Sequence, residues 1–472
     1  MIKKIVFLII SFILIRLTAV SQTAIDTVWS GYIGLTSSKL KIVVRINSEN
    51  NVLKANIDIP EQNATKLELV NVSFDNPKVH FELESPLGQA IFDGLYYSDS
   101  ISGTFEQASF KGKFSLFKDW REAEDTLKEE NLLYNAEEVS FTNDSIIFAG
   151  TLTYPKTEGK HPAVILISGS GPQNRDENIF GFKIFKIIAE HLSKNGIAVL
   201  RFDDRGVGKT NGKTVNESTT ADFAGDVIAA VKYLKTRDNI NPGQIGLMGH
   251  SEGGVVAPLA ASNSDDIAFI VLMAGTGVSG ADIITGQSSL ILKADKSTDE
   301  EIENYIKMLN SVIDAIKNNK SLDAVKEQIR NDIIDNFDKI PEKQRKEIKD
   351  KEKYAAEAAE QTIATFNSVW MKYFVLYDPA PALAKIKCPV LVLFGELDLQ
   401  VAPEQNRKPI IDALKKGGNK DYKVIIFPKA NHLFQLSETG SPTEYASLPK
   451  EFVPGFLDAV SGWILQRVTV VK

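Results

Sequence analysis

The sequence has one cysteine and five histidines, and these shortages limit the chemistry that it can support. Cys388 alone cannot form an internal disulfide, and it precedes a hydrophobic stretch, where a thiol packs more often than it reacts. The sequence contains neither an H-E-x-x-H motif nor a cysteine-histidine spacing of the kind that binds zinc. We therefore predict no metal and no cofactor.

Basic residues are outnumbered by acidic ones, 54 against 61, and the formal charge is −7. Affinity for nucleic acid depends largely on basic residues that neutralise phosphates, so we expect no nucleic-acid partner. Two glycine-rich stretches resemble nucleotide-binding motifs, but neither has all the glycines that its motif requires. A Walker A loop ending at Thr210 would need glycine at Asp203, and a dinucleotide motif starting at Gly169 would need glycine at Asn174.

A hydrophobic run long enough to cross a membrane is missing near the N-terminus. The run from Ile5 to Ile15 spans about 11 residues, whereas a spanning helix needs about 20. Lys3 and Lys4 precede this run and the small residues Ala19 to Ser21 follow it, which is typical of a cleaved signal peptide. We expect cleavage of residues 1–21, export to the periplasm or the medium, and no stable membrane insertion of the mature chain.

The segment that follows has the pattern of an antiparallel β domain. In Val52 to Ile59, hydrophobic and polar side chains partly alternate, as expected where one sheet face is buried and the other meets water. We expect a curled sheet or a small barrel that is either a scaffold or a separate ligand-binding module. Short β-rich stretches separated by turn residues run from about Thr27 to Lys118; examples are Lys41 to Ile46, Val52 to Ile59, Leu67 to Phe74, Val79 to Glu84 and Ala90 to Tyr97.

From Glu137 onward, hydrophobic strands alternate with helical segments, which predicts an α/β fold with a mainly parallel sheet. A long helical insertion interrupts this alternation, and Thr298 and Glu301 form a capping box at one of its helices. We interpret the insertion as a helical cap over the site. The expected parts are a signal peptide (1–21), an N-terminal β domain (22–120), a linker (121–136), a catalytic domain (137–278 and 386–472) and the cap (279–385).

The strongest motif is the pentapeptide from Gly249 to Gly253, which reads G-H-S-E-G and follows the expected strand Ile245 to Met248. In α/β-hydrolases, G-x-S-x-G forms a sharp strand-to-helix turn that exposes the serine and leaves no room for bulky neighbours. A serine hydroxyl is a weak nucleophile and needs a histidine base oriented by a carboxylate. Ser251 is therefore the candidate nucleophile.

Position along the chain selects the base and the acid. Only His432 follows a late strand, at the edge of the sheet where the serine turn also opens. The order in this fold is serine, acid, histidine, which favours Asp398, just beyond the expected strand Val390 to Phe394. Glu396 remains the rival acid. The histidines that this argument sets aside are His80, His161, His191 and His250.

Negative charge on a tetrahedral intermediate needs preorganised backbone N–H donors. We expect one from Glu252, directly after the serine. We expect the second from Ser170, in the loop that follows the expected strand Val164 to Ser168.

With these residues, the chain resembles the EstD-like secreted serine esterases, a bacterial group within the α/β-hydrolase superfamily. The resemblance covers Glu137 to the C-terminus, and one departure is Ser168, where the group usually has histidine. This departure puts the packing of the loop and the oxyanion geometry in doubt. The shared stretches are Ser168 to Asp176, Arg201 to Gly208, the serine pentapeptide, Tyr377 to Ala380 and Gly395 to Val401.

The resemblance implies hydrolysis of short acyl esters, an N-terminal β domain and a helical cap. It also implies that Trp370, Met371 and Phe374 line an acyl pocket, although their spacing equally suits packing against the core. We thus expect a serine carboxylesterase that acts on a small ester through an acyl-enzyme. A serine peptidase is one alternative, although residues 22–120 lack the repeat of a propeller that would gate peptides. A non-enzymatic binding protein on a hydrolase scaffold is the other alternative.

Overall fold

In the computed structural model, the chain divides into two compact units. One contains the chain up to Leu132 together with Asn178–Phe182 and Tyr445–Pro449, and the other contains the remaining residues. The predicted signal peptide, residues 1–21, lies outside the described residues, as does most of the expected linker, residues 121–136. The structure describes residues 25–34, 39–49, 52–59, 64–84, 89–107, 110–118, 132–339, 345, 348 and 350–468.

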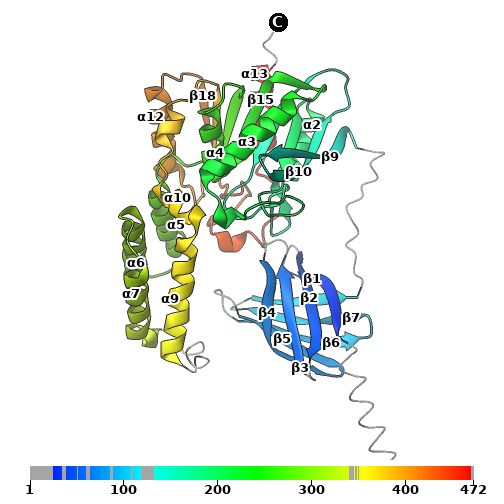
Figure 1. Ribbon diagram of the computed structural model, residues 1–472, viewed down its shortest axis with the longest axis vertical. Helices are drawn as coiled ribbons and strands as arrows, with labels where there is room; N and C mark the ends of the chain where they lie inside the picture. The colour runs from blue at the N-terminus through cyan, green and yellow to red at the C-terminus, as the bar shows by residue number, and fades with distance from the viewer. Residues whose placement is uncertain are drawn as a thin grey trace, which may run out of the picture. The chain divides into compact units, whose positions relative to one another are not determined.

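The first unit contains a closed antiparallel barrel in which β1 pairs with both β2 and β8 (Figure 1). This confirms the expected antiparallel β domain and shows that it is a barrel. β1, β7 and β8 also lie within the expected β domain, residues 22–120. The strands are β1 (Thr27–Gly34), β2 (Lys39–Glu49), β3 (Val52–Ile59), β4 (Ala64–Asp75), β5 (Lys78–Leu83), β6 (Ala90–Tyr97), β7 (Ser100–Gln107) and β8 (Phe110–Phe117).

Aromatic side chains fill the interior of this barrel. Trp29, Phe81, Phe92 and Phe114 come from four different strands, and each is 1% exposed or less. The rings of Phe81 and Phe92 stack with their centroids 4.7 Å apart. Small barrels of eight strands are just wide enough for such side chains to fill them. The interior is therefore a packed core, which favours the scaffold alternative over a ligand carried inside the barrel.

The second unit is built on a sheet with the order β18-β17-β16-β15-β11-β14-β10-β9. In this order, the six strands β18, β17, β16, β15, β11 and β14 pair in parallel with their neighbours. β10 pairs antiparallel with β14 and with β9, so the expected mainly parallel sheet is confirmed. Regular structure begins at Tyr134, inside the expected linker. The strands of this sheet are β9 (Tyr134–Asn143), β10 (Ile146–Pro155), β11 (His161–Ile167), β14 (Ala198–Phe202), β15 (Ile240–His250), β16 (Phe269–Met273), β17 (Val390–Gly395) and β18 (Tyr422–Phe427). β12 (Asn178–Ile179) and β13 (Phe182–Lys183) form a separate two-stranded sheet, in which residues 178–182 belong to the first unit.

Helices cover both faces of this sheet, with α2 against α13 and α3 against α4 (Figure 1). The carboxyl ends of its parallel strands lie at one edge, so the loops after β11, β15, β17 and β18 gather there. The helices outside the insertion between β16 and β17 are α2 (Ile184–Lys194), α3 (Thr220–Lys235), α4 (Gly253–Ala261), α12 (Pro403–Lys416) and α13 (Phe456–Val468), with short 3-10 turns η3 (Val215–Glu217) and η5 (Pro442–Glu444). The 3-10 turn η4 (Phe337–Lys339) and the short helix α11 (Ala380–Leu383) lie within that insertion.

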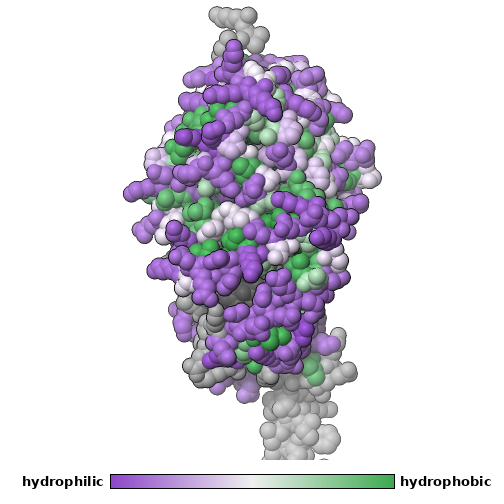
Figure 2. Space-filling model, turned by 90° about the vertical axis from the view of Figure 1, so that its left-hand side faces the viewer, coloured by the Kyte–Doolittle hydropathy of each residue, from purple (hydrophilic) through white to green (hydrophobic). Residues whose placement is uncertain are grey.

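A helical insertion separates β16 from β17. Its helix α6 starts at the predicted capping box, where the carboxylate of Glu301 accepts the N–H of Thr298 at 2.7 Å. Figure 2 shows that the surface on the side of α6 and α7 is mostly hydrophilic, with small separate hydrophobic areas. Among the described residues, no helix is both long and apolar enough to span a bilayer. The helices are α5 (Gly280–Ala294), α6 (Asp299–Lys317), α7 (Asp323–Asp335), α9 (Lys351–Asn367) and α10 (Val369–Leu376).

We predict that Gly103→Ala destabilises the barrel. Gly103 faces Gly94 across β7 and β6, and a Cβ at Gly103 would lie 1.9 Å from the backbone oxygen of Asp93. Because backbone must move to relieve this overlap, we expect a loss of about 1–3 kcal/mol, measured by chemical unfolding. Gly34→Ala is the control, since its Cβ would lie 3.4 Å from the carbonyl oxygen of Lys113, an ordinary contact distance. Equal unfolding of the two variants would contradict the prediction.

Candidate active site

Ser251 lies in the sharp turn between β15 and α4, and its backbone is left-handed, with φ of +53°. This conformation is uncommon for a residue other than glycine and persists where the surrounding structure imposes it. Two glycines make the turn possible. A Cβ at Gly249 would lie 1.9 Å from the oxygen of Gly253, and a Cβ at Gly253 would lie 2.1 Å from the oxygen of Ile167. The turn therefore has the geometry of a nucleophile elbow.

Asp398 and His432 come from different loops and are joined by a hydrogen bond. Asp398 follows β17 and His432 follows β18, and His432 Nδ1 lies 2.8 Å from Asp398 Oδ2. The two residues are 2% and 3% exposed. With Asp398 ionised, a neutral His432 carries its proton on Nδ1, so Nε2 keeps its lone pair. This tautomer is the one that a general base needs.

The carboxylate of Asp398 is held on its other side by its own turn. Asp398 Oδ1 accepts the N–H groups of Gln400 and Val401, each at 2.8 Å, which directs Oδ2 toward His432. The rival acid, Glu396, accepts the N–H of Lys429 at 2.8 Å. Glu396 therefore braces the loop before His432, and the geometry favours Asp398 as its partner.

The histidines that the sequence argument set aside have partners elsewhere. His80 contacts Asp93 and Glu82 in the barrel, His161 contacts the carbonyl of Thr157, and His191 contacts Ser461. No group of three or more His, Cys, Asp and Glu side chains in the described part of the chain is arranged to hold a metal ion.

His250, the variable residue of the pentapeptide, connects the serine turn to the loop of His432. Its Nε2 lies 3.1 Å from the backbone oxygen of His432, and its Nδ1 lies 2.9 Å from Glu177 Oε1. The ring centroids of His250 and His432 are 4.8 Å apart. Because Ser251 follows His250 directly, these contacts bring the candidate nucleophile and the candidate base to the same edge of the sheet.

The loop after β11 lies directly against the serine turn. A Cβ added to Gly169 would lie 3.2 Å from Ser251 Cβ and 3.2 Å from Glu177 Oε1. The N–H of Gly169 donates to Glu177 Oε1 at 2.7 Å, so this amide is already used. The loop is thus close enough to serve the serine, and Ser170 remains the predicted donor on it.

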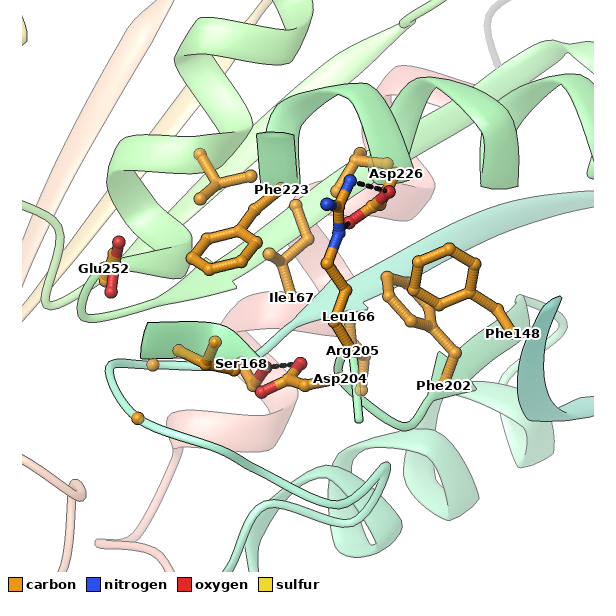
Figure 3. Close-up of a pocket in the computed structure, with 15 residues that line it drawn as sticks. Phe148, Leu166, Ile167, Ser168, Phe202, Asp204, Arg205, Phe223, Asp226 and Glu252 are labelled. Carbon is orange, nitrogen blue, oxygen red and sulfur yellow. Dashed lines mark hydrogen bonds and ion pairs between the residues drawn. The ribbon is translucent and has the colours of Figure 1, made fainter. Parts of the chain in front are cut away.

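Asp204 holds the loop after β11 through two hydrogen bonds. It accepts a hydrogen bond from the hydroxyl of Ser168 at 2.7 Å (Figure 3) and another from the N–H of Gln173 at 2.8 Å. Burial raises the pKa of Asp204 to about 8, the charges of Glu177 and Glu252 add to this rise, and the two hydrogen bonds oppose it. Ser168, the departure from the EstD-like pattern, is therefore one of the groups that hold this carboxyl in place.

Ion pairs also join the stretch 168–176 to the stretch 201–208. Arg175 holds Asp203 through two hydrogen bonds, Nε to Oδ1 at 3.0 Å and Nη2 to Oδ2 at 2.8 Å. In the second pair the arginine comes from the other stretch, because Arg201 pairs with Asp176. Bidentate pairs of this kind fix geometry as well as charge. The two stretches that are most distinctive of the resemblance are therefore physical partners, and together they brace the loop beside Ser251.

Glu252 is a buried carboxyl whose partners come from three parts of the unit. Trp370 Nε1 of α10 lies 3.0 Å from both of its oxygens, and the hydroxyl of Thr220 donates at 2.8 Å. Burial raises the pKa of Glu252, while hydrogen bonds from Trp370, Thr220 and Ser170 oppose the rise. Glu252 therefore ties the serine turn to α3, to the loop of Ser170 and to the cap.

These contacts bear on the residues expected to line an acyl pocket. The indole N–H of Trp370 is directed at Glu252, and its ring stacks on Phe374 with centroids 5.8 Å apart. Phe374 belongs to the buried core of the cap, and Met371 packs against that core. The structure thus favours packing over pocket lining for Met371 and Phe374, and it gives Trp370 a polar partner that its spacing did not indicate.

A small cavity lies beside the loop and is lined by both polar and hydrophobic side chains (Figure 3). The polar ones are Ser168, Asp204, Glu252 and the ion-paired Arg205 and Asp226, and the hydrophobic ones include Phe223. Its volume is about 30 Å³, room for one or two water molecules. Ser251 is not among its lining residues, so we interpret the cavity as part of the support of the loop.

The fold and the serine turn define this protein as a hydrolase with the α/β-hydrolase fold, and comparison with known proteins agrees. The chain belongs to the family Hydrolase_4, described as serine aminopeptidase, S33, whose model matches residues 182–439, more than half of the chain. It is 28% identical over 322 residues to esterase EstD of Thermotoga maritima. That alignment covers 67% of this chain and 65% of EstD, so it spans less than two thirds of the relative.

Other similar proteins align over shorter stretches or at lower identity. A putative carboxymethylenebutenolidase of Synechocystis is 27% identical over 138 residues, which cover 26% of this chain and 52% of the relative. Among solved structures, the Pyrococcus furiosus esterase Pf2001 aligns with a TM-score of 0.43 and 18% identity, over 74% of this chain and 95% of that one. Est1E of Butyrivibrio proteoclasticus, solved with ferulic acid bound, aligns with a TM-score of 0.39 and 18% identity, over 70% of this chain and 99% of that one.

We predict that Asp204→Asn flattens the dependence of stability on pH. The pKa of Asp204 is about 8 in the folded chain, against about 4 for an unfolded aspartate. The stability that the protonated group contributes is therefore complete below about pH 4 and is lost as the pH rises through about 8. An asparagine replaces the protonated carboxyl and cannot ionise.

Thermal unfolding midpoints between about pH 5 and 9 test this prediction. The wild type should lose more stability than Asp204→Asn over this interval, and Asp265→Asn, at an exposed site, should follow the wild type. Parallel curves for the wild type and Asp204→Asn would show that Asp204 is ionised throughout.

Proposed function

We propose that this protein is a serine carboxylesterase that hydrolyses short-chain acyl esters. Ser251 is the nucleophile, His432 is the general base and Asp398 orients the base. The observation that supports this most directly is the 2.8 Å contact between His432 Nδ1 and Asp398 Oδ2, in loops next to a left-handed elbow serine. Such a contact fixes the histidine tautomer that can accept the serine proton.

In the proposed reaction, Ser251 Oγ attacks the ester carbonyl while His432 Nε2 takes its proton. The N–H groups of Ser170 and Glu252 stabilise the oxyanion. The carbon–oxygen bond to the alcohol then breaks, and His432 returns the proton to the leaving alcohol. Water attacks the acyl-enzyme with the same histidine as base, and the acid departs as Ser251 regains its proton.

A serine peptidase is the second candidate, because the description of the matching family names an aminopeptidase. An esterase is favoured because the relative with the longest of the reported alignments is named an esterase. Turnover of p-nitrophenyl acetate compared with that of alanyl and prolyl p-nitroanilides separates the two. An esterase cleaves the acetate ester far faster, and a peptidase cleaves an anilide at a comparable or higher rate.

We also propose that the protein acts outside the cytoplasm, in the periplasm or the medium. The proposal depends on the basic start, short hydrophobic run and small residues within positions 1–21. The mass of the mature N-terminus in the producing cell tests it. A chain beginning near residue 22 supports export, and a retained Met1 in the cytoplasmic fraction contradicts it.

We predict that Ser251→Ala lowers kcat for p-nitrophenyl acetate by roughly 10⁴-fold or more without unfolding the chain. Asp398→Asn should cost a loss of similar order, because the amide no longer imposes the tautomer with Nε2 unprotonated. Ser262→Ala is the matched control, since its hydroxyl bonds the carbonyl of Leu259 at the other end of α4. Full activity of Ser251→Ala would refute the proposed mechanism, and a wild type without turnover would favour a binding protein.

A further inference from the structure

Glu177 is a buried carboxylate that the proposed reaction does not use. It is 1% exposed, and its Oε1 accepts the N–H of Gly169 at 2.7 Å and lies 2.9 Å from His250 Nδ1. Its Oε2 is buried without a hydrogen-bond partner among the described residues. Burying a carboxylate in this way is costly, so a residue of this kind calls for a role that offsets the cost.

The partners of His250 fix where its protons lie. The partner of Nε2 is the backbone oxygen of His432, which can only accept, so Nε2 carries a proton. A neutral His250 would then present the lone pair of Nδ1 to Glu177 Oε1, which also accepts from Gly169. The 2.9 Å contact therefore requires a further proton between Nδ1 and Oε1.

The arrangement is that of an imidazolium facing a carboxylate. Burial lowers the pKa of His250, but the charge and hydrogen bond of Glu177, the carbonyl of His432 and the charge of Asp398 outweigh it and raise the pKa above its ordinary value. Both ring nitrogens of His250 are engaged by these partners. His250 is therefore not a rival general base, although it lies next to Ser251.

We propose that Glu177 and His250 form a second carboxylate–imidazole pair that positions the oxyanion loop and the general base relative to each other. The inference rests on the proposed function. Glu177 holds the loop through Gly169, one residue before the predicted donor Ser170, and His250 holds the backbone of His432. Neither residue touches the reacting atoms, so both are positioning residues.

The close packing of the loop makes such positioning effective. A Cβ added at Gly169 would lie 3.2 Å from both Glu177 Oε1 and Ser251 Cβ, so glycine at this position lets the loop approach both groups closely. A displacement of about 1 Å in a catalytic arrangement can lower a rate by about 100-fold. Loss of the pair should therefore lower kcat more than it changes KM.

Three substitutions separate the contacts. His250→Asn keeps an amide near the position of Nδ1 and so keeps a donor for Glu177, but it loses the donor to the carbonyl of His432. His250→Gln keeps an amide near the position of Nε2 and loses the donor to Glu177. Glu177→Gln removes the charge. Glu158→Gln, at an exposed site, is the matched control.

Steady-state kinetics with p-nitrophenyl acetate, on variants that retain the wild-type circular dichroism spectrum, test the proposal. We expect each variant of the pair to lower kcat by roughly 10- to 100-fold with KM changed much less, and the control to match the wild type. The double variant Glu177→Gln with His250→Gln should lose less than the product of the single losses, because both remove the same contact.

Three results would overturn the proposal: kcat near the wild-type value in folded variants, losses confined to KM, or losses that multiply fully in the double variant. If a Glu177 variant fails to fold, the two His250 variants still decide. Ser251→Ala, measured beside these variants, separates a failure of the proposed function from a failure of this inference. Activity in Ser251→Ala defeats the proposed function, whereas an inactive Ser251→Ala with fully active pair variants defeats only this inference.

Discussion

The hydrogen bond between Asp398 and His432 links the loops at the ends of β17 and β18, and the proposed chemistry depends on it. A mainly parallel sheet makes the bond possible, because it gathers its carboxyl-end loops at one edge. The turn at Ser251 opens at this same edge, and His250 ties that turn to the backbone of His432. Residues far apart in the sequence are thereby held together by backbone as well as by side chains.

Three acids hold the oxyanion loop and the serine turn in place, and each has a different set of partners. Asp204 holds the loop through Ser168 and Gln173, Glu177 holds it through Gly169, and Glu252 ties the elbow to the cap through Trp370. Backbone donors can stabilise an oxyanion only if they are already in place when charge develops. We interpret this set of braces as the source of that preorganisation, with burial keeping Asp204 protonated near neutral pH.

Hydrophobic periodicity and local motifs predicted the sheet, the cap and the elbow, because each depends on short-range patterns such as glycines around Ser251. The pattern left open whether the β domain is a curled sheet or a barrel, because closure depends on the pairing of β1 with β8, which lie far apart in the sequence. The sequence pattern could not predict tertiary contacts. Glu177 and His250 are 73 positions apart, and Trp370 and Glu252 are 118 apart, so no local signal paired them. The hydrogen bond between Asp398 and His432 is compatible with their predicted roles.

The most direct test of the central claim is covalent labelling by a fluorophosphonate, followed by peptide mapping. The account predicts one adduct, on Ser251, which forms rapidly in the wild type and is lost when His432 is replaced by alanine. A wild type that stays unlabelled, or an adduct on another residue that persists without His432, would contradict the claim that these side chains form one nucleophilic site.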